Sequence, residues 1–247
     1  MFAIIGGSGL ARLAGLETQR RELVRTPYGD PSGPLTFGRL DGREIVFLAR
    51  HGYGHTIGPH EINYRANLSA LKRVGVAGIV AVATVGGIRS DCGPGTLVVP
   101  DQIVDYTFGR RGTFFEGLEE PVTHIDFTEP YDETVRQRLV IAAARLNEPI
   151  AVGGTYGCTQ GPRLETAAEI RRMERDGCDL VGMTGMPEAA LARELDLPNA
   201  TLAVVVNYAA GKGDSLRKVS LEAVAGVLEA SMARVRSVLS EFVKMGG

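Results

Sequence analysis

Short apolar runs alternate with helical patterns along almost the whole chain. The runs have the length and composition of buried β-strands. They occupy residues 2–5, 45–48, 78–84, 96–99, 150–154, 180–183 and 201–206. Strands that alternate with helices form a mostly parallel sheet that helices cover on both faces. Because no linker, low-complexity tract or internal repeat divides the sequence, we predict a single α/β domain over residues 1–247.

The segments between the apolar runs have the period of amphipathic helices. They cover residues 63–74, 132–146, 165–176, 188–195 and 220–244. Gly75 and Gly177 directly follow two of these segments, as expected of residues that end helices. Ser220 stands where it can cap the last helix. The polar, glycine-rich residues 109–121 are expected to form a long loop rather than a domain boundary.

Composition and charge exclude several classes of protein. A net charge of −2 gives no basic surface, so we expect no nucleic-acid partner. No apolar run approaches the ~20 residues of a membrane-spanning helix, so we expect no membrane association. The opening MFAIIGGSGL lacks the basic segment of a signal peptide. The three cysteines are scattered without a CxxC spacing, which favours free thiols, no metal site and a cytoplasmic location.

Polar or glycine-rich residues follow the predicted strands, at the sheet edge where open α/β folds bind ligands. Residues 6–10, GGSGL, follow the first strand, and their N–H groups and serine hydroxyl can form an anion nest. Residues 50–67 follow the second strand and hold three of the four histidines. Within them, Arg50 can contact phosphate oxygens with two parallel N–H groups. The two segments together predict a site for an anionic small molecule.

Three later strand ends carry further candidates. Thr84 precedes two glycines, and Met183 and Thr184 precede a helix. Asn207 directly follows three valines, and a carboxamide at the mouth of a buried strand needs partners. Its carbonyl and NH2 groups can accept and donate side by side, as the edge of a heterocycle requires.

Each of these features also has a simpler explanation. The sequence GGSG is an ordinary tight turn, and methionine is most often a packing residue. For Arg50 and His51 the simpler explanation is a solvated arginine and a core histidine, which their occurrence together directly after an apolar run disfavours. Polar groups at several successive strand ends favour a site, because packing does not explain them.

Long segments of the chain resemble the trimeric family of purine nucleoside phosphorylases and methylthioadenosine phosphorylases. They are residues 50–67, RHGYGHTIGPHEINYRAN, residues 161–170, GPRLETAAEI, and residues 181–194, VGMTGMPEAALARE. The resemblance runs from GGSGL to the final helix. It implies one α/β domain with a central mixed sheet flanked by helices, and a homotrimer with sites near the subunit interfaces. It also implies phosphorolysis, in which phosphate attacks the anomeric carbon of a purine nucleoside.

The resemblance also assigns residues to roles, with phosphate as a co-substrate and no metal or organic cofactor. It implies phosphate binding by Ser8, Arg50, His51, Ala83, Thr84 and Thr184. Contacts to the nucleoside are expected from Leu164, Glu165, Met183, Asn207, Tyr208, Ala209, Leu221 and, from a neighbouring subunit, His124. Of these, His51 and Asn207 are the residues expected to act in catalysis.

Departures from the family pattern indicate which base is bound. Methylthioadenosine phosphorylases have aspartates at the positions of Asn207 and Ala209, where a carboxyl group suits the 6-amino group and N7 of adenine. Asparagine can present its NH2 to a 6-oxo group instead. Glu165 agrees, because a carboxylate can accept the N1–H that hypoxanthine and guanine carry and adenine lacks. The base is therefore predicted to be a 6-oxopurine.

The sugar end differs from that of the ordinary purine nucleoside phosphorylases. Those enzymes place a histidine near the start of the final helix to bind the 5′-hydroxyl, and here Val219 and Leu221 stand at that point. An apolar wall suits a methylthio group and leaves a hydroxyl unpaired at a cost of ~1–3 kcal/mol. A 6-oxo base with an apolar 5′ pocket predicts S-methyl-5′-thioinosine as the substrate.

Other readings of the sequence stay open. Methylthioadenosine and ordinary 6-oxopurine nucleosides are the nearest alternative substrates. A non-catalytic nucleoside-binding protein could use the same loops, but it would not release free base. A hydrolytic nucleosidase would need a carboxylate general base near the anomeric carbon and would have no use for the cluster of Arg50, His51 and Thr184.

Overall fold

The structure, a computed structural model, describes residues 1–117 and 121–246. Within these residues eleven strands form one sheet. The strands are β1 (Phe2–Gly6), β2 (Glu17–Glu22), β3 (Leu35–Leu40), β4 (Arg43–Ala49), β5 (Gly78–Gly87), β6 (Leu97–Val99), β7 (Gln102–Asp105), β8 (Ile150–Val152), β9 (Thr155–Cys158), β10 (Leu180–Gly182) and β11 (Asn199–Tyr208). The helices are α1 (Tyr64–Arg73), α2 (Glu133–Arg145), α3 (Ala167–Arg175), α4 (Gly185–Glu194) and α5 (Leu221–Lys244), with a short 3₁₀ turn at Gly213–Ser215.

Side-chain caps fix where the predicted helices begin. The Asn63 side chain accepts a hydrogen bond from the N–H of Ala66 at the start of α1, and Ser220 caps α5 in the same way. Thr166 and Glu169 form a reciprocal capping box at the start of α3. The five predicted helices are all present, with boundaries that differ by one to three residues at most of their ends. No described helix has the length and apolar character needed to cross a membrane.

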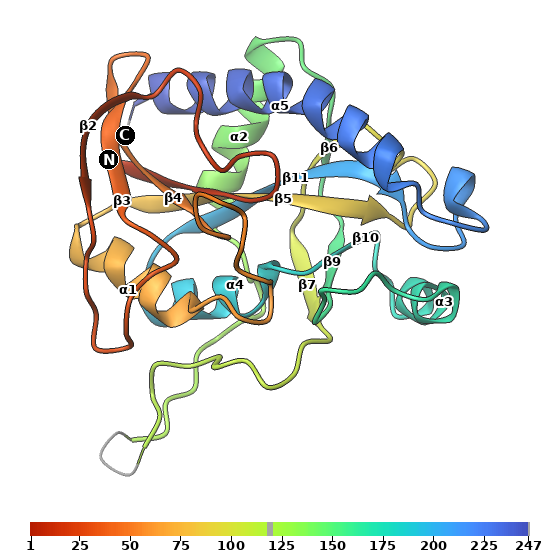
Figure 1. Ribbon diagram of the computed structural model, residues 1–247, viewed down its shortest axis with the longest axis horizontal. Coiled ribbons are helices and arrows are strands. Elements are labelled where there is room, and N and C mark those ends of the chain that lie inside the picture. The colour runs from red at the N-terminus through yellow and green to blue at the C-terminus, as the bar shows by residue number, and fades with distance from the viewer. Residues whose placement is uncertain (118–120, 247) are drawn as a thin grey trace.

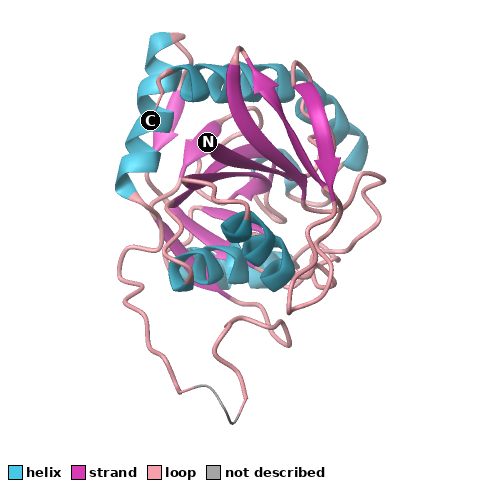
Figure 2. Cartoon of the chain, turned by 90° about the vertical axis from the view of Figure 1, so that its left-hand side faces the viewer, coloured by secondary structure: helices cyan, strands magenta, loops and turns pink. Residues whose placement is uncertain are grey.

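Helices cover both faces of the sheet, as the two views in Figures 1 and 2 show. Alternate residues of a strand face opposite layers. Ile4 of β1 belongs to the core cluster formed with α2 and α5, whereas Ala3 and Ile5 belong to the cluster formed with α1 and α4. Helix α3 lies beyond these layers, beside β9 and β10 (Figure 1). The buried runs thus read as nearly continuous apolar sequence because both faces are covered.

The sheet is mixed, as the family resemblance implies, and six of its ten strand pairings among the described residues are parallel. Its main path runs β2-β3-β4-β1-β5-β10-β9-β7, and β11, β6 and β8 continue from β5 on a branch. Strands β2–β3, β3–β4, β5–β10 and β6–β11 pair antiparallel. Four of the strands, β2, β3, β7 and β9, lie outside the apolar runs of the sequence. The fully exposed β2, ETQRRE, has no apolar signal because it covers no core.

Two strands meet the same edge of β5 from opposite directions. Strand β1 pairs in parallel with residues 78–81 of β5, and β10 pairs antiparallel with Gly86 and Gly87. The carboxyl ends of β1 and β10 therefore face each other across residues 82–85 of β5, where neither strand reaches. An interruption of this kind is where open α/β sheets bind ligands. Strand β5 also runs on to Gly87, beyond its predicted end at Thr84, so Thr84 lies within the strand.

Candidate active site

A cavity of about 530 Å³ lies at this interruption, between the ends of β1 and β10 and the middle of β5. The sequence-predicted residues that line it are Ser8, Arg50, His51, Ala83, Thr84, Leu164, Glu165, Met183, Thr184, Asn207 and Leu221. They come from segments far apart in the chain. The topology thus brings most of the predicted site residues to one place.

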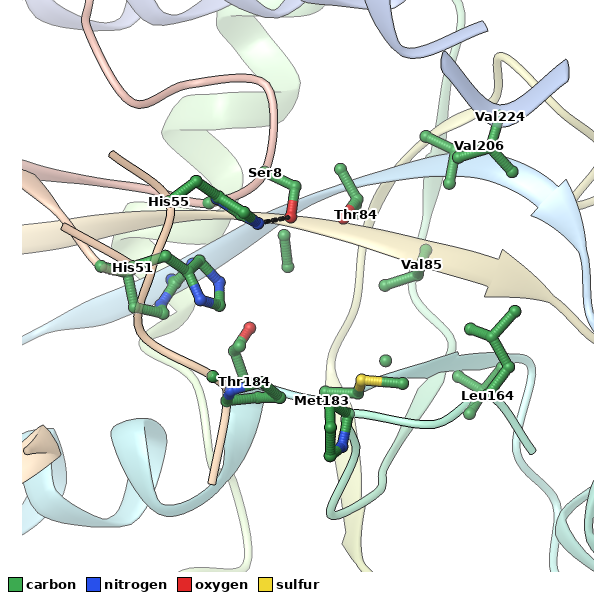
Figure 3. A pocket seen from close by; sticks show the side chains of 18 of the residues that line it. Ser8, His51, His55, Thr84, Val85, Leu164, Met183, Thr184, Val206 and Val224 are labelled. Carbon is green, nitrogen blue, oxygen red and sulfur yellow. Dashed lines mark hydrogen bonds between the residues drawn. The ribbon is translucent and has the colours of Figure 1, made fainter. Parts of the chain in front are cut away.

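Hydroxyl and imidazole groups gather at one end of the cavity, as Figure 3 shows. Ser8 stands on the turn after β1, and its Oγ lies 3.5 Å from Nε2 of His55. The rings of His51 and His55 are tilted against each other with centroids 4.6 Å apart. Two threonine hydroxyls complete this polar end: Thr84 lies on β5, and Thr184 directly follows Met183 (Figure 3). Such hydrogen-bonding groups around one space suit a polyoxygen anion.

Arg50 lines the same cavity and is held by a buried carboxylate. Its Nε and Nη2 donate to the two carboxylate oxygens of Glu188 at 2.7 and 2.8 Å, and its Nη1 donates to the carbonyl of Val82 at 2.9 Å. Burial by itself would lower the pKa of Arg50, but the adjacent carboxylate outweighs it and the pKa is raised. The guanidinium is therefore charged and fixed. Two of its five N–H bonds remain for a ligand.

His51 is buried and neutral. Its Nδ1 lies 2.8 Å from the carbonyl oxygen of Ile57, which only an N–H can satisfy. Burial, and then the positive charge of Arg50, lower the pKa of His51 to about 4. In this tautomer Nε2 carries a lone pair. His51 can therefore accept a hydrogen bond from a protonated oxygen of a bound anion.

Asn207 is turned into the cavity by an irregularity in β11. The pairing of β11 with β5 skips a residue between Val205 and Asn207, which makes Val206 the extra residue of a bulge. Nδ2 of Asn207 donates to the carbonyl of Tyr208 at 2.6 Å, which leaves its second N–H and its carbonyl oxygen for a ligand. The bulge thus aims a donor and an acceptor together.

Glu165 lines the same cavity from a different segment. Its Oε1 accepts a hydrogen bond of 2.6 Å from the hydroxyl of Thr159. Burial raises the pKa of Glu165, an effect that this hydrogen bond partly opposes. The carboxyl group is therefore oriented, with its other oxygen free of protein partners among the described hydrogen bonds.

The remaining end of the cavity is apolar. Val206 and Val224 lie together at this end, with Leu164 on the opposite side (Figure 3). Val219 and Leu221, at the start of α5, also line the cavity. Leu221 is 70% exposed and Leu164 is 45% exposed, so both stand at the rim. The apolar wall predicted around Leu221 is present and extends to Val224 and Val206.

Three predicted substrate contacts lie elsewhere. Tyr208 and Ala209 do not line the cavity. Alternate residues of a strand point to opposite faces, so the Tyr208 side chain points away from that of Asn207, and Ala209 lies beyond the end of β11. The Tyr208 hydroxyl donates to the carbonyl of Ser90, and Ala209 is buried in a cluster with Ile88. His124 is exposed on the long segment that follows β7 and lies outside the cavity of its own subunit. Residues 118–120 of the predicted loop 109–121 lie outside the described part of the chain.

The structure adds residues to the site that the sequence argument did not select. His55 and His60 line the cavity from within the predicted histidine-rich segment, and Pro162 lines it beside Leu164. Glu188 accepts hydrogen bonds from Arg50, but in the sequence it is marked only as a residue of a predicted helix. A buried ion pair between residues so far apart in the chain leaves no local pattern. The three histidines within residues 50–67 were the signal that could have identified His55 and His60.

Comparisons with known sequences agree with this geometry. A sequence profile of the phosphorylase superfamily matches residues 1–244. A protein of Pseudomonas syringae pv. tomato named probable S-methyl-5′-thioinosine phosphorylase is 52% identical over 97% of both chains. A 6-oxopurine nucleoside phosphorylase of Pyrococcus furiosus is 50% identical over 85% of this chain and 80% of its own.

A solved structure extends the agreement to three dimensions. Methylthioadenosine phosphorylase from Schistosoma mansoni in complex with adenine superposes with a TM-score of 0.94 at 34% identity, covering 99% of this chain and 91% of that one. The similarity therefore includes the mixed sheet, its helical layers and the strand ends that form the cavity. On the profile match, the sequence identities and this superposition, the chain is a member of the phosphorylase superfamily.

Proposed function

We propose that this enzyme catalyses the reversible phosphorolysis of S-methyl-5′-thioinosine to hypoxanthine and 5-methylthioribose 1-phosphate, a reaction of purine salvage. The observation that carries the proposal is a single cavity with the Asn207 carboxamide on one wall and an apolar end at Val206 and Val224. The relatives named probable S-methyl-5′-thioinosine phosphorylase support it, at up to 53% identity.

Phosphate, the co-substrate, occupies the polar end of the cavity in this proposal. Ser8, Thr84 and Thr184 offer hydroxyl donors, with the backbone at Ala83 beside them, and Arg50 offers its two free N–H bonds. His51 is neutral, so its Nε2 accepts a hydrogen bond from the phosphate hydroxyl rather than donating one. The anion is thereby held with its unprotonated oxygens free to face the sugar.

The reaction follows from charge. A phosphate oxygen forms a bond to C1′ while the bond from C1′ to N9 breaks, and the electron pair of that bond stays on the purine. The sugar gains positive charge in the transition state, and phosphate stabilises it as both ion-pair partner and nucleophile. Asn207 stabilises the negative charge that develops on the base. A preorganised donor of this kind contributes about 3 kcal/mol to catalysis.

The base and the 5′ substituent are recognised by opposite kinds of surface. The free N–H of Asn207 donates to the 6-oxo group, and Glu165 accepts the N1–H of the base. Met183 lies against the ribose, and Leu164 packs beside the base. Val219, Leu221, Val224 and Val206 enclose the methylthio group without offering a partner to a hydroxyl.

We further propose that the chain is one nucleoside phosphorylase domain over residues 1–247 and acts as a cytoplasmic homotrimer. Leu221 and Leu164 are exposed at the rim of the cavity, where a neighbouring subunit would cover them. His124, exposed after β7, is the residue that we assign to a neighbour's site. No metal or organic cofactor takes part in the proposed reaction, which needs only phosphate.

Specificity constants test the substrate. We expect kcat/KM with phosphate to be at least about tenfold higher for methylthioinosine than for methylthioadenosine, inosine or guanosine, since each unsatisfied polar group costs ~1–3 kcal/mol. Release of free base is followed by chromatography. Preference for methylthioadenosine would contradict the role of Asn207, and preference for inosine would contradict the apolar pocket. Release of base in the absence of phosphate would show that the reaction is hydrolysis rather than phosphorolysis.

A second candidate is phosphorolysis of ordinary 6-oxopurine nucleosides. The 50% identical relative named 6-oxopurine nucleoside phosphorylase favours it, and Asn207 and Glu165 would serve it equally well. The two candidates differ only at the 5′ end of the cavity. The comparison of methylthioinosine with inosine therefore decides between them.

A further inference from the structure

Arg110 makes an unusual set of hydrogen bonds behind the wall of the cavity. It does not line the cavity itself. Nη1 donates to the carbonyl oxygens of Met183 at 2.9 Å and Met186 at 2.5 Å, and to the Tyr64 hydroxyl at 3.2 Å. Nη2 donates to the carbonyl oxygens of Thr159 at 3.2 Å and Gln160 at 2.8 Å, and Nε donates to Oε1 of Gln160 at 3.1 Å.

These acceptors belong to separate walls of the site. The carbonyls of Met183 and Met186 stand on either side of Thr184 and Gly185, at the polar end of the cavity. The carbonyls of Thr159 and Gln160 precede the segment that carries Leu164 and Glu165. One guanidinium therefore joins the segment that meets phosphate and ribose to the segment that meets the base.

A third wall is joined through Tyr64. The Tyr64 hydroxyl accepts from Arg110 and donates to the carbonyl of Pro59 at 2.9 Å. Pro59 lines the cavity between His55 and Glu61. The guanidinium also lies over the Tyr64 ring, 5.4 Å from its centroid. A displacement of Arg110 would thus shift three of the segments that line the cavity.

The partners of Arg110 are neutral. Within the described residues no carboxylate lies within 4.0 Å of its guanidinium, whereas Arg50 is paired with Glu188. Carbonyl oxygens of four residues match the several donors of the arginine fork, and a lysine ammonium cannot reach all of them at once. An arginine that serves in an ion pair would face a carboxylate. The neutral acceptors around Arg110 instead fit an arginine that holds several peptide groups in fixed positions.

We propose that Arg110 is a positioning residue for the phosphorolytic reaction. It holds the peptide at Met183 and Thr184 in register with the segment of Leu164 and Glu165, so that phosphate, ribose and base meet in line. The inference rests on the proposed function, because it names the groups that Arg110 aligns. A misplacement of about 1 Å in such an alignment costs roughly 100-fold in rate.

Two variants test the role. R110M removes every donor at similar length, and R110K keeps the charge without the fork. We expect kcat/KM for methylthioinosine to fall roughly 100-fold in R110M and roughly tenfold in R110K, with KM for phosphate and for nucleoside both raised. Because R110K keeps a cation in the same place, it gives an answer even where R110M fails to fold. R138M is the matched control, since Arg138 donates to the carbonyl of Phe242 in α5, away from the cavity.

Chemical rescue separates positioning from folding. It uses R110A, in which the space of the side chain is vacated. Guanidinium chloride at about 50 mM, far below the molar concentrations that unfold domains, should raise the activity of R110A at least about tenfold. Sodium chloride at the same concentration should not, and neither salt should raise the activity of the control R138A. The thermal midpoint of R110A, with and without guanidinium, shows whether recovered activity accompanies recovered stability.

The outcomes distinguish the two proposals. Wild-type enzyme without phosphate-dependent base release would refute the proposed function, whatever the variants do. An active wild type would leave that function standing. In that case Arg110 would lose its role if R110K and R110M kept kcat/KM within about twofold, or if their losses simply followed the folded fraction and guanidinium had no effect.

Discussion

Asn207 is the residue on which the proposed choice between 6-oxo and 6-amino bases depends. Its Nδ2 has one N–H free for a 6-oxo group, since the other donates to the carbonyl of Tyr208. In Asn207→Asp that N–H becomes an acceptor. We expect the ratio of kcat/KM for methylthioinosine to that for methylthioadenosine to fall roughly 10- to 100-fold, because an unpaired buried group costs ~1–3 kcal/mol. Competition between the two nucleosides in one reaction measures the ratio directly.

The same chemical change elsewhere supplies the control. Asn147 is exposed in the loop after α2. Asn147→Asp adds the same charge to the molecule without facing the cavity and should leave the ratio unchanged. An unaltered ratio in Asn207→Asp as well would mean that Asn207 does not contact position 6 of the base.

His51 links the site to pH. Its pKa is lowered to about 4, chiefly by burial, whereas an unfolded chain would protonate it near 6.5. Between these values the unfolded state binds more protons, so the free energy of unfolding falls as the pH falls from 6.5 towards 4. Above pH 7.5 the histidine is neutral in both states and contributes no pH dependence. We expect a loss of up to about 2 kcal/mol between pH 7.5 and pH 5 from this residue.

Urea unfolding of the wild type and of His51→Asn measures that loss. The asparagine can still donate to the Ile57 carbonyl but does not titrate. The difference in unfolding free energy between the two proteins should change by the expected amount between the two pH values. A difference that stays constant with pH would show that His51 titrates at its ordinary pKa.

Among single residues, the sequence identified those that a local pattern marks. Ser8, Arg50, His51, Thr184 and Asn207 each follow an apolar run, and all line the cavity. Glu188 and Arg110 act through contacts with distant segments, and no spacing along the chain predicts such contacts. Tyr208 and Ala209 were selected because they follow Asn207 in the sequence. Side chains alternate along a strand, so Tyr208 points away from the cavity, and Ala209 lies beyond the end of β11 in the cluster with Ile88.

At the scale of elements, the site depends on how closely the turn after β1 approaches β5. A Cβ on Gly7 would lie 2.6 Å from the carbonyl oxygen of Val82 and 3.0 Å from Nη1 of Arg50. Gly7→Ala should therefore displace the turn that carries Ser8, together with the Arg50 guanidinium. We expect KM for phosphate to rise roughly tenfold or more, with a smaller change in KM for nucleoside. Initial rates at varied phosphate concentration measure it.

Gly226→Ala is the matched control for Gly7→Ala. Gly226 lies in α5, where a Cβ meets nothing within 4 Å. Alanine there should raise the unfolding free energy by about 0.5–1 kcal/mol and leave phosphate kinetics unchanged. Unchanged phosphate kinetics in Gly7→Ala would show that the turn tolerates a methyl group and does not fix the phosphate site.

The sequence predicted the elements that have an apolar run or a helical period, and it missed the strands that have neither, including the buried β3 and β9. Helices α1–α5 and strands β1, β4–β6, β8, β10 and β11 have apolar periodicity or continuous apolar runs. Strand β2 is polar throughout, and β9 is the short TYGC. The reversed direction of β10 has no signature in its own residues. The direction depends on the strands with which β10 pairs, and these pairings exist only in the assembled sheet.

At the scale of the whole molecule, the proposed homotrimer predicts that sites are shared. A His124→Ala subunit has an intact Asn207 but cannot supply His124 to a neighbouring site. An Asn207→Ala subunit supplies His124 but has no working site of its own. Mixed trimers contain sites in which an intact Asn207 meets an intact His124. If the subunits assemble at random in equal numbers, such sites restore about a quarter of the wild-type activity. Co-expression of the two variants, followed by an assay of methylthioinosine phosphorolysis, measures it.

Each variant assembled alone gives the baseline for this experiment. The mixture must exceed the mean of the two baselines, and light scattering must give a mass three times that of one chain. Activity equal to that mean would place His124 outside any neighbour's site. A monomeric mass would contradict the trimer itself.

The pairing of Arg50 with Glu188 has a consequence for how phosphate enters. The two charges cancel inside the protein, and the neighbouring His51 is uncharged. This buried pair therefore projects little electric field into the solvent and does not draw in an approaching anion over long range. Entry of phosphate is then governed by diffusion and fit, so dissolved salt should hardly slow its capture.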